Sequence, residues 1–168
     1  MTMMRRLREG VKSGQIRYGL RSTAIALSWV PVIAYIANHV AWIGVIDGSS
    51  MSPTLNPDSN GFVRDVVMMT KYNVSEYSNL NRGDIVVLRN PRDGESSVVK
   101  RIIGLEGDRI KTKYPYPKSR CIVPARHVWI EGDNIHSVDS NTYGPVSFRL
   151  INAKLAYIVF PFSRIGPI

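Results

Sequence analysis

The chain has 168 residues, of which 44% are hydrophobic and 21% charged, so it is long enough for one domain with a buried core and is not disordered in composition. Of its net charge of +9, residues 1–21 alone carry six basic side chains against one acid, and the remainder is only mildly basic. Without a concentrated basic stripe, no nucleic-acid partner is expected. The single cysteine, Cys121, excludes an internal disulfide, and no Cys/His spacing indicates a zinc site.

An uncharged run follows the basic N-terminus. Residues 22–46, STAIALSWVPVIAYIANHVAWIGVI, contain no Asp, Glu, Lys or Arg and are longer than the about 20 residues that a helix needs to cross a bilayer. Trp29 and Trp42 lie nearer its ends, as interfacial aromatic residues often do. We predict a basic segment over 1–21 and one transmembrane helix over 22–46. A buried core helix and a cleaved signal peptide are the alternatives.

The remaining residues, 47–168, are typical of short strands separated by turns. Apolar or alternating runs predict strands over 61–70, 84–89, 97–103, 109–113, 127–131 and 154–160. Gly, Pro, Asn and Asp cluster between them, and residues 89–97 indicate a hairpin turn. We therefore expect a mainly β fold, an antiparallel β-domain on the far side of the membrane from the basic flank. Residues 111–120, KTKYPYPKSR, are predicted to be a solvated loop.

One lysine is a candidate base for the serine-rich stretch DGSSMSPTLNP, residues 47–57. A serine needs a base to attack, and a lysine serves only if its pKa falls by about 3 units through burial or a nearby positive charge. In SSVVKRIIG, Lys100 shares a strand face with Val98 and Ile102. Arg101 is flanked equally well on the other face, but a guanidinium does not deprotonate, which leaves Lys100. The alternative is a lysine that extends its amine to solvent.

Four stretches in order, GSSMSPTLNP, RGDIVVLRNP, VVKRIIGLEGD and EGDNIHSVDSNTYGPV, resemble the sequence boxes of type I signal peptidases. The resemblance runs from about residue 22 to the C-terminus. Within that family, LSWVPV, SMSPTLNP and DSNTYGPV are similar to the branch of mitochondrial inner membrane proteases. The resemblance implies a signal-peptidase-like β-domain with a Ser/Lys dyad.

Carried over position by position, the resemblance implies that Ser50 is the nucleophile and Lys100 the general base. Ser137 would orient the lysine. Asp139 would brace the site against Arg101.

Two positions depart from the family pattern. Asn141 stands where the family usually has a second arginine, so a reduced ion-pair network is expected. Gly48 stands where some bacterial relatives have a hydroxyl residue that helps to bind the oxyanion. The backbone N–H of Ser50 is therefore expected to carry that role.

The activity implied by the resemblance is that of a membrane-anchored serine endopeptidase without metal or organic cofactor. It would cut precursors with bipartite sorting signals on the intermembrane-space side of the mitochondrial inner membrane, as a heterodimer with a related subunit 1 and in contact with membrane lipid. A bacterial-type plasma-membrane signal peptidase and a catalytically silent membrane-anchored scaffold are the alternatives.

Overall fold

The computed structural model describes residues 23–35, 41–57, 63–71 and 76–168. Residues 23–35 are helical, and the chain divides into two compact units, residues 1–39 and 40–168. None of the helices in the described ranges combines the length and the hydropathy that a membrane span requires. The predicted basic segment over 1–21 lies outside the described residues.

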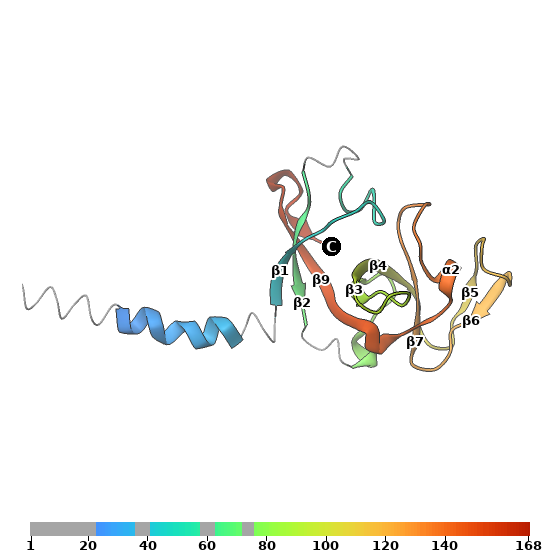
Figure 1. The fold of residues 1–168 in the computed structure, drawn as a ribbon, viewed down its shortest axis with the longest axis horizontal. Coiled ribbons are helices and arrows are strands. Elements are labelled where there is room, and N and C mark those ends of the chain that lie inside the picture. Colours follow the sequence, from blue (N-terminus) through green and yellow to red (C-terminus); the bar gives the residue numbers. More distant parts are fainter. Residues whose placement is uncertain (1–22, 36–40, 58–62, 72–75) are drawn as a thin grey trace, which may run out of the picture. The chain divides into compact units, whose positions relative to one another are not determined.

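The second unit is built almost entirely of strands and short helical turns (Figure 1). In chain order its elements are β1 (Ala41–Val45), β2 (Val66–Thr70), η1 (Tyr77–Asn79), β3 (Ile85–Arg89), β4 (Ser97–Gly104), β5 (Arg109–Lys111), β6 (Arg120–Ile122), β7 (His127–Glu131), α2 (Ser140–Tyr143), β8 (Val146–Ser147), η2 (Phe148–Leu150), β9 (Ile151–Phe160), η3 (Phe162–Arg164) and β10 (Gly166–Pro167).

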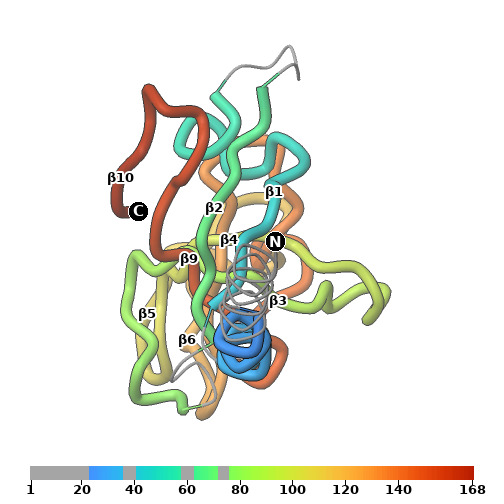
Figure 2. Tube along the Cα trace, turned by 90° about the vertical axis from the view of Figure 1, so that its left-hand side faces the viewer, coloured from blue at the N-terminus to red at the C-terminus, as the bar shows by residue number. Residues whose placement is uncertain are grey.

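All strand pairs in the described residues are antiparallel, which confirms the predicted antiparallel β-domain. Eight strands form one sheet in the order β1-β2-β9-β3-β4-β7-β8, with β10 added on β9, and β5 and β6 form a separate ribbon. The ten-residue strand β9 pairs with β2 along one part and with β3 along another. It therefore bends through the middle of a curled sheet, as Figures 1 and 2 show.

Strand β3 has a hydrophobic core on each face. Ile85 and Val87 belong to one cluster with residues of β2 and β9, and Val86 and Leu88 belong to a second with residues of β4 and β7. Because successive side chains alternate across a strand, a run of four apolar residues is what burial on both faces requires. The two cores fix β4 beside β3, with Lys100 opposite Val86.

The predicted membrane helix over residues 22–46 is wrong at its C-terminal end, because residues 41–45 form strand β1. β1 pairs residue for residue with β2. Trp42 packs against the core while Ile43 and Val45 are exposed, which is the alternation of a half-buried strand. A run without charges does not by itself distinguish the end of a helix from an edge strand. Residues 22 and 36–40 lie outside the described residues.

The predicted strands differ from the observed strands mainly at their first and last residues. Residues 127–131 form β7 as predicted, and residues 89–97 connect the antiparallel pair β3 and β4. Residues 61–62 of the first predicted strand lie outside the described part of the chain. The short strands β6, β8 and β10 were not predicted, because two or three residues are too few to show a period.

A buried ion pair ties the C-terminus to the loop after Ser50. Asp65 is 1% exposed, and its two carboxylate oxygens accept hydrogen bonds from Arg164 at 2.7 and 2.5 Å. Asp65 also accepts from the backbone N–H of Asn56 at 2.8 Å, while Arg164 donates to the carbonyl of Thr54. Residues 54–56 are therefore held between β2 and η3.

We expect the substitution Arg164→Met to lower the free energy of unfolding by roughly 3 kcal/mol, because it leaves the buried Asp65 charge without its partner. Arg64→Met is the matched control. Arg64 pairs with Asp47 at 3.4 Å, but both side chains are more than half exposed, so its loss should cost less than about 1 kcal/mol. Urea unfolding followed by fluorescence measures both, and equal effects would contradict the structural role given to the pair.

Candidate active site

Ser50 lies in a tight turn over residues 49–55 (the Ser50 turn), which two buried side chains hold in place. Met51 is 2% exposed and Leu55 is fully buried, and both belong to the core cluster shared with β2 and β9. The Leu55 N–H donates to the Met51 carbonyl at 2.9 Å, which closes one turn between them. With these neighbours fixed in the core, the half-buried Ser50 lies on the wall of a cavity.

Lys100 is buried at the centre of β4. Its side chain is 3% exposed, and its Nζ donates a hydrogen bond to Ser137 Oγ at 2.7 Å. Burial lowers the pKa of Lys100 below its ordinary value, and the negative charge of Asp139 opposes that shift. The alternative in which this lysine extends into solvent is therefore wrong.

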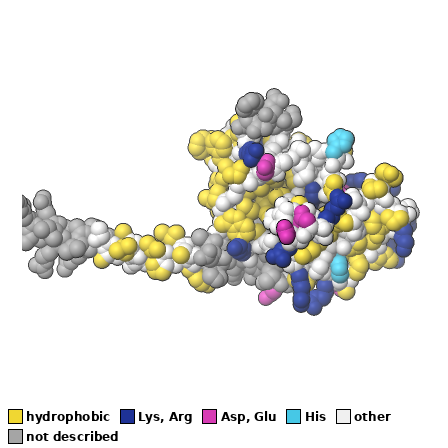
Figure 3. Space-filling model, in the orientation of Figure 1, with side chains coloured by type: hydrophobic (Ala, Val, Ile, Leu, Met, Phe, Trp, Pro, Cys, Tyr) yellow, Lys and Arg dark blue, Asp and Glu magenta, His cyan; other side chains and the backbone are white. Residues whose placement is uncertain are grey.

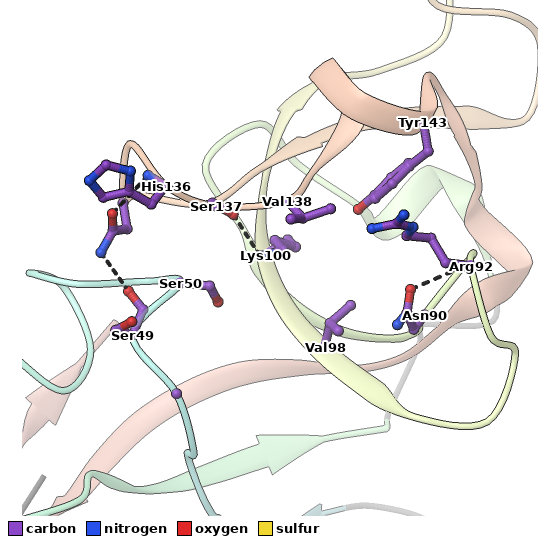
Figure 4. A pocket seen from close by; sticks show the side chains of 12 residues that line it. Ser49, Ser50, Asn90, Arg92, Val98, Lys100, His136, Ser137, Val138 and Tyr143 are labelled. Carbon is purple, nitrogen blue, oxygen red and sulfur yellow. Dashed lines mark hydrogen bonds between the residues drawn. The ribbon is translucent and has the colours of Figure 1, made fainter. Parts of the chain in front are cut away.

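Ser50, Lys100 and Ser137 line one cavity of about 380 Å³. Figure 4 shows Ser50 toward one end of it, with Lys100 and Ser137 near the middle. The far end carries Arg92 and Tyr143, which come from the β3–β4 hairpin and from α2. Ser50, Lys100 and Ser137 are far apart in the sequence, but the fold brings them to one cavity.

The loop that follows β7 is fastened directly to the Ser50 turn. Asn134 donates from its backbone N–H to the Ser50 carbonyl at 3.1 Å and from its side chain to the Ser49 carbonyl at 3.0 Å. Gly132 fits where no larger residue does, because an added Cβ would lie 2.1 Å from Ser137 Oγ and 2.4 Å from the Ser50 carbonyl oxygen. These contacts set the position of Ser137 relative to Ser50.

Asp139 does not contact Arg101, so the predicted ion pair between them is wrong. Asp139 instead caps α2: it accepts from the Asn141 N–H at 3.0 Å and from the Gly132 N–H at 3.2 Å. The short β7–α2 loop turns its carboxylate back onto its own backbone rather than toward β4. Its remaining influence on Lys100 is through charge.

Arg101 pairs with Asp133 instead, through two hydrogen bonds at 2.9 and 2.6 Å. The hydrogen bonds from Arg101 lower the pKa of Asp133, so this carboxylate is charged at neutral pH. Arg101 also donates to the carbonyl of Gly83 and weakly to Thr54 Oγ1. It therefore braces the β7–α2 loop against β4 from the side opposite Lys100.

Asn141 links two buried carboxylates. Its amide nitrogen donates to Asp139 and to Glu131, each at 3.1 Å. Burial raises the pKa of Glu131, but hydrogen bonds from Lys113, Trp129 and Asn141 outweigh it and lower that pKa below its ordinary value. The loop predicted to be solvated thus supplies a cation, Lys113, to the network behind the site.

Sequence reasoning singled out the stretch from 131 to 146 as one box but missed what several of its residues do. Gly132, Asp133 and Asn134 hold the loop, but the sequence assigned no role to any of the three individually. Tyr143 and Arg92 gave no signal, because nothing in the sequence indicates that the β3–β4 hairpin and α2 meet at one cavity.

We expect Gly132→Ala to destabilise the protein by about 1–3 kcal/mol, because the new methyl group overlaps both Ser137 and the Ser50 backbone. Gly166→Ala is the control, since no atom lies within 4 Å of its added Cβ, and we expect its effect to stay within about 0.5 kcal/mol. Thermal unfolding of the two variants makes the comparison. Similar melting temperatures would mean that the loop can move to accommodate the methyl group without loss of stability, which contradicts the close fit at Gly132.

Comparisons with known proteins agree with the sequence resemblance. The family described as signal peptidase, peptidase S26, matches residues 19–115. Mitochondrial inner membrane protease subunit 2 of Saccharomyces cerevisiae is 45% identical over 156 residues, covering 92% of this chain and 88% of that protein. The protein of the same name in Schizosaccharomyces pombe is 48% identical over 141 residues, covering 83% and 76%.

Subunit 1 of the same protease is also similar. In Mus musculus it is 39% identical over 138 residues, which cover 80% of this chain and 79% of that protein. The identity to subunit 2 is higher in both yeasts than to this subunit 1. From the matched family and these relatives, we conclude that the chain belongs to the signal peptidase family, peptidase S26.

Proposed function

We propose that Ser50 and Lys100 form the catalytic dyad of this signal-peptidase-type hydrolase. One observation carries the proposal: the Lys100 amine is buried, hydrogen-bonded to Ser137 and open to the same cavity as Ser50. Burial favours the uncharged amine, and only the uncharged amine can accept a proton from a serine hydroxyl. No other lysine or histidine in the described residues combines such burial with a place on this cavity, since His136 is exposed.

In the proposed reaction, Ser50 Oγ attacks the scissile carbonyl carbon while Lys100 Nζ takes its proton. Lys100 then gives that proton to the leaving amine, and the acyl-enzyme is hydrolysed by a water molecule that Lys100 activates in the same way. Ser137 keeps the amine aimed into the cavity, because their 2.7 Å hydrogen bond restricts the rotation of the long side chain.

The negative charge that develops on the carbonyl oxygen needs donors already in place. Within the described part of the chain the Ser50 N–H forms no hydrogen bond, so it is available to the oxyanion. One such donor is worth about 3–4 kcal/mol in related acyl transfer. Gly48, with φ at +89° and no atom within 4 Å of an added Cβ, leaves space beside it but contributes no side-chain donor.

The mitochondrial inner membrane is the location named for the relatives, and we propose it for this chain. The uncharged segment before β1 would be a single-pass anchor, with the β-domain in the intermembrane space as the basic flank implies. Exposed apolar side chains on β1 and near the C-terminus, among them Ile43, Val45 and Phe162, support an approach to lipid. Figure 3 shows hydrophobic side chains gathered at that end of the domain.

We also propose a substrate class and a partner for this chain. We propose that the chain removes sorting peptides from intermembrane-space precursors and pairs with a subunit 1. Relatives named subunit 2 and subunit 1 both match most of the chain, which supports two related subunits of one protease. An extended precursor would lie along the cavity between Ser50 and Arg92.

We predict that Ser50→Ala and Lys100→Met each lower the rate of precursor cleavage by roughly 10³-fold or more, since each removes one half of the proposed dyad. Ser52→Ala, which removes a hydroxyl from the same turn but does not line the cavity, should keep the activity. The readout is processing of an intermembrane-space precursor in mitochondria where every variant accumulates to the level of the unmodified protein. Normal processing by either dyad variant would favour the scaffold alternative.

A second prediction concerns the pH dependence of kcat/KM. Cleavage needs neutral Lys100, so kcat/KM rises as pH rises through the pKa of this amine. Because the Asp139 charge raises that pKa, Asp139→Asn should move the rising limb to lower pH, while asparagine still caps α2. Glu76→Gln, an exposed charge removal away from the cavity, should leave the limb in place. A shift to higher pH in Asp139→Asn would contradict Lys100 as the titrating base.

A further inference from the structure

The end of the cavity opposite Ser50 carries a cation that the proposed mechanism does not use. Arg92 lines the cavity from the tip of the β3–β4 hairpin, and its side chain is exposed. Its backbone N–H is bonded to Asn90 Oδ1 at 3.1 Å, which fixes the turn. Its guanidinium forms no ion pair with any carboxylate in the described ranges.

The second group at this end is the hydroxyl of Tyr143. It is buried and has no hydrogen-bond partner among the described residues, although a buried hydroxyl normally finds one. Burial and the charge of Asp139 raise the pKa of Tyr143, and the nearby Arg92 opposes them without prevailing, so the group stays a neutral O–H donor. Figure 4 shows the Tyr143 hydroxyl beside the Arg92 guanidinium.

One negatively charged acceptor placed between the two groups would pair with the Arg92 guanidinium and give the Tyr143 hydroxyl the partner it lacks. A guanidinium binds a carboxylate through paired N–H donors, and a neighbouring hydroxyl adds a third donor. Val98 and Val138 form apolar walls between this end and Lys100, which suits the passage of an extended peptide rather than a free ion. The carboxylate is then a side chain of the peptide whose carbonyl lies at Ser50.

We propose that Arg92 and Tyr143 form a subsite for the carboxylate of an Asp or Glu side chain close to the scissile bond of the precursor. The inference rests on the proposed function of Ser50 and Lys100, and it adds a charge preference to it. Arg92 contributes the cation and Tyr143 fixes the position of the carboxylate. Neither touches the reacting atoms, so both are specificity residues rather than catalytic ones.

The experiment uses the full-length protein and synthetic peptides that span one cleavage site. Glu is placed in turn at each position on either side of the scissile bond, and each Glu peptide is compared with its Gln counterpart. At one position we expect kcat/KM to be about tenfold higher for Glu than for Gln, which is near the low end of what hydrogen bonds to a charged group contribute. The Glu:Gln ratio is taken within each variant, so differences in folded fraction cancel.

Three substitutions assign the preference. Arg92→Gln should bring the Glu:Gln ratio close to one, and Arg92→Glu should make a Lys peptide better than the Glu peptide at that position. Tyr143→Phe, which removes only the hydroxyl, should lower the ratio by a few-fold. Arg149→Gln is the matched control: Arg149 is exposed and does not line the cavity, so its variant should keep the full ratio.

The outcomes separate this subsite from the dyad. A wild-type ratio near one at every position, or an unchanged ratio in Arg92→Gln, overturns the subsite while cleavage of the Gln peptides still supports Ser50 and Lys100. If Arg149→Gln also brings the Glu:Gln ratio close to one, the preference for Glu depends on the overall charge of the protein, and the subsite is overturned. Failure of the wild-type protein to cut any of the peptides would contradict the proposed function itself.

Discussion

The structure around the cavity depends on keeping one amine away from water. Burial lowers the pKa of Lys100, and each unit of this shift means that the charged form has become about 1.4 kcal/mol less favourable relative to the neutral form. The surrounding protein has to sustain that cost, and it does so with two cores on the faces of β3 that hold β4 in register. The hydrogen bond to Ser137 gives the neutral amine a defined direction as well as a partner.

Three contacts between distant parts of the chain turn that buried amine into a site. Asn134 fastens the β7–α2 loop to the Ser50 turn, and Arg101 holds the same loop through Asp133. Asp65 and Arg164 hold the other side of the turn through residues 54–56. The Ser50 turn is thus fixed by polar contacts on two sides and by Met51 from within, and its serine faces the remaining open side.

How much of this the sequence reveals depends on the distance over which each interaction acts. The apolar run of β3 and the alternation around Lys100 are local, and both were readable. The four ordered boxes brought Ser50 and Lys100 into one hypothesis, and both line one cavity. The sequence did not reveal which charged side chains would form ion pairs. Arg101 binds Asp133 rather than Asp139, because the path of the eight-residue loop between β7 and α2 decides which carboxylate faces β4. Strand β1 was not predicted either, because its partner β2 lies beyond a loop in the sequence.

Asn141 sets the electrical environment of the amine in a way that a cation at the same place would not. A neutral amide satisfies the hydrogen-bonding needs of Asp139 and Glu131 without cancelling either charge. The full field of Asp139 therefore still reaches Lys100 and holds its proton more tightly. A basic side chain at position 141 would offset the charge of Asp139 and lower the pKa of Lys100 further, so the amine would stay neutral to a lower pH than it does beside asparagine.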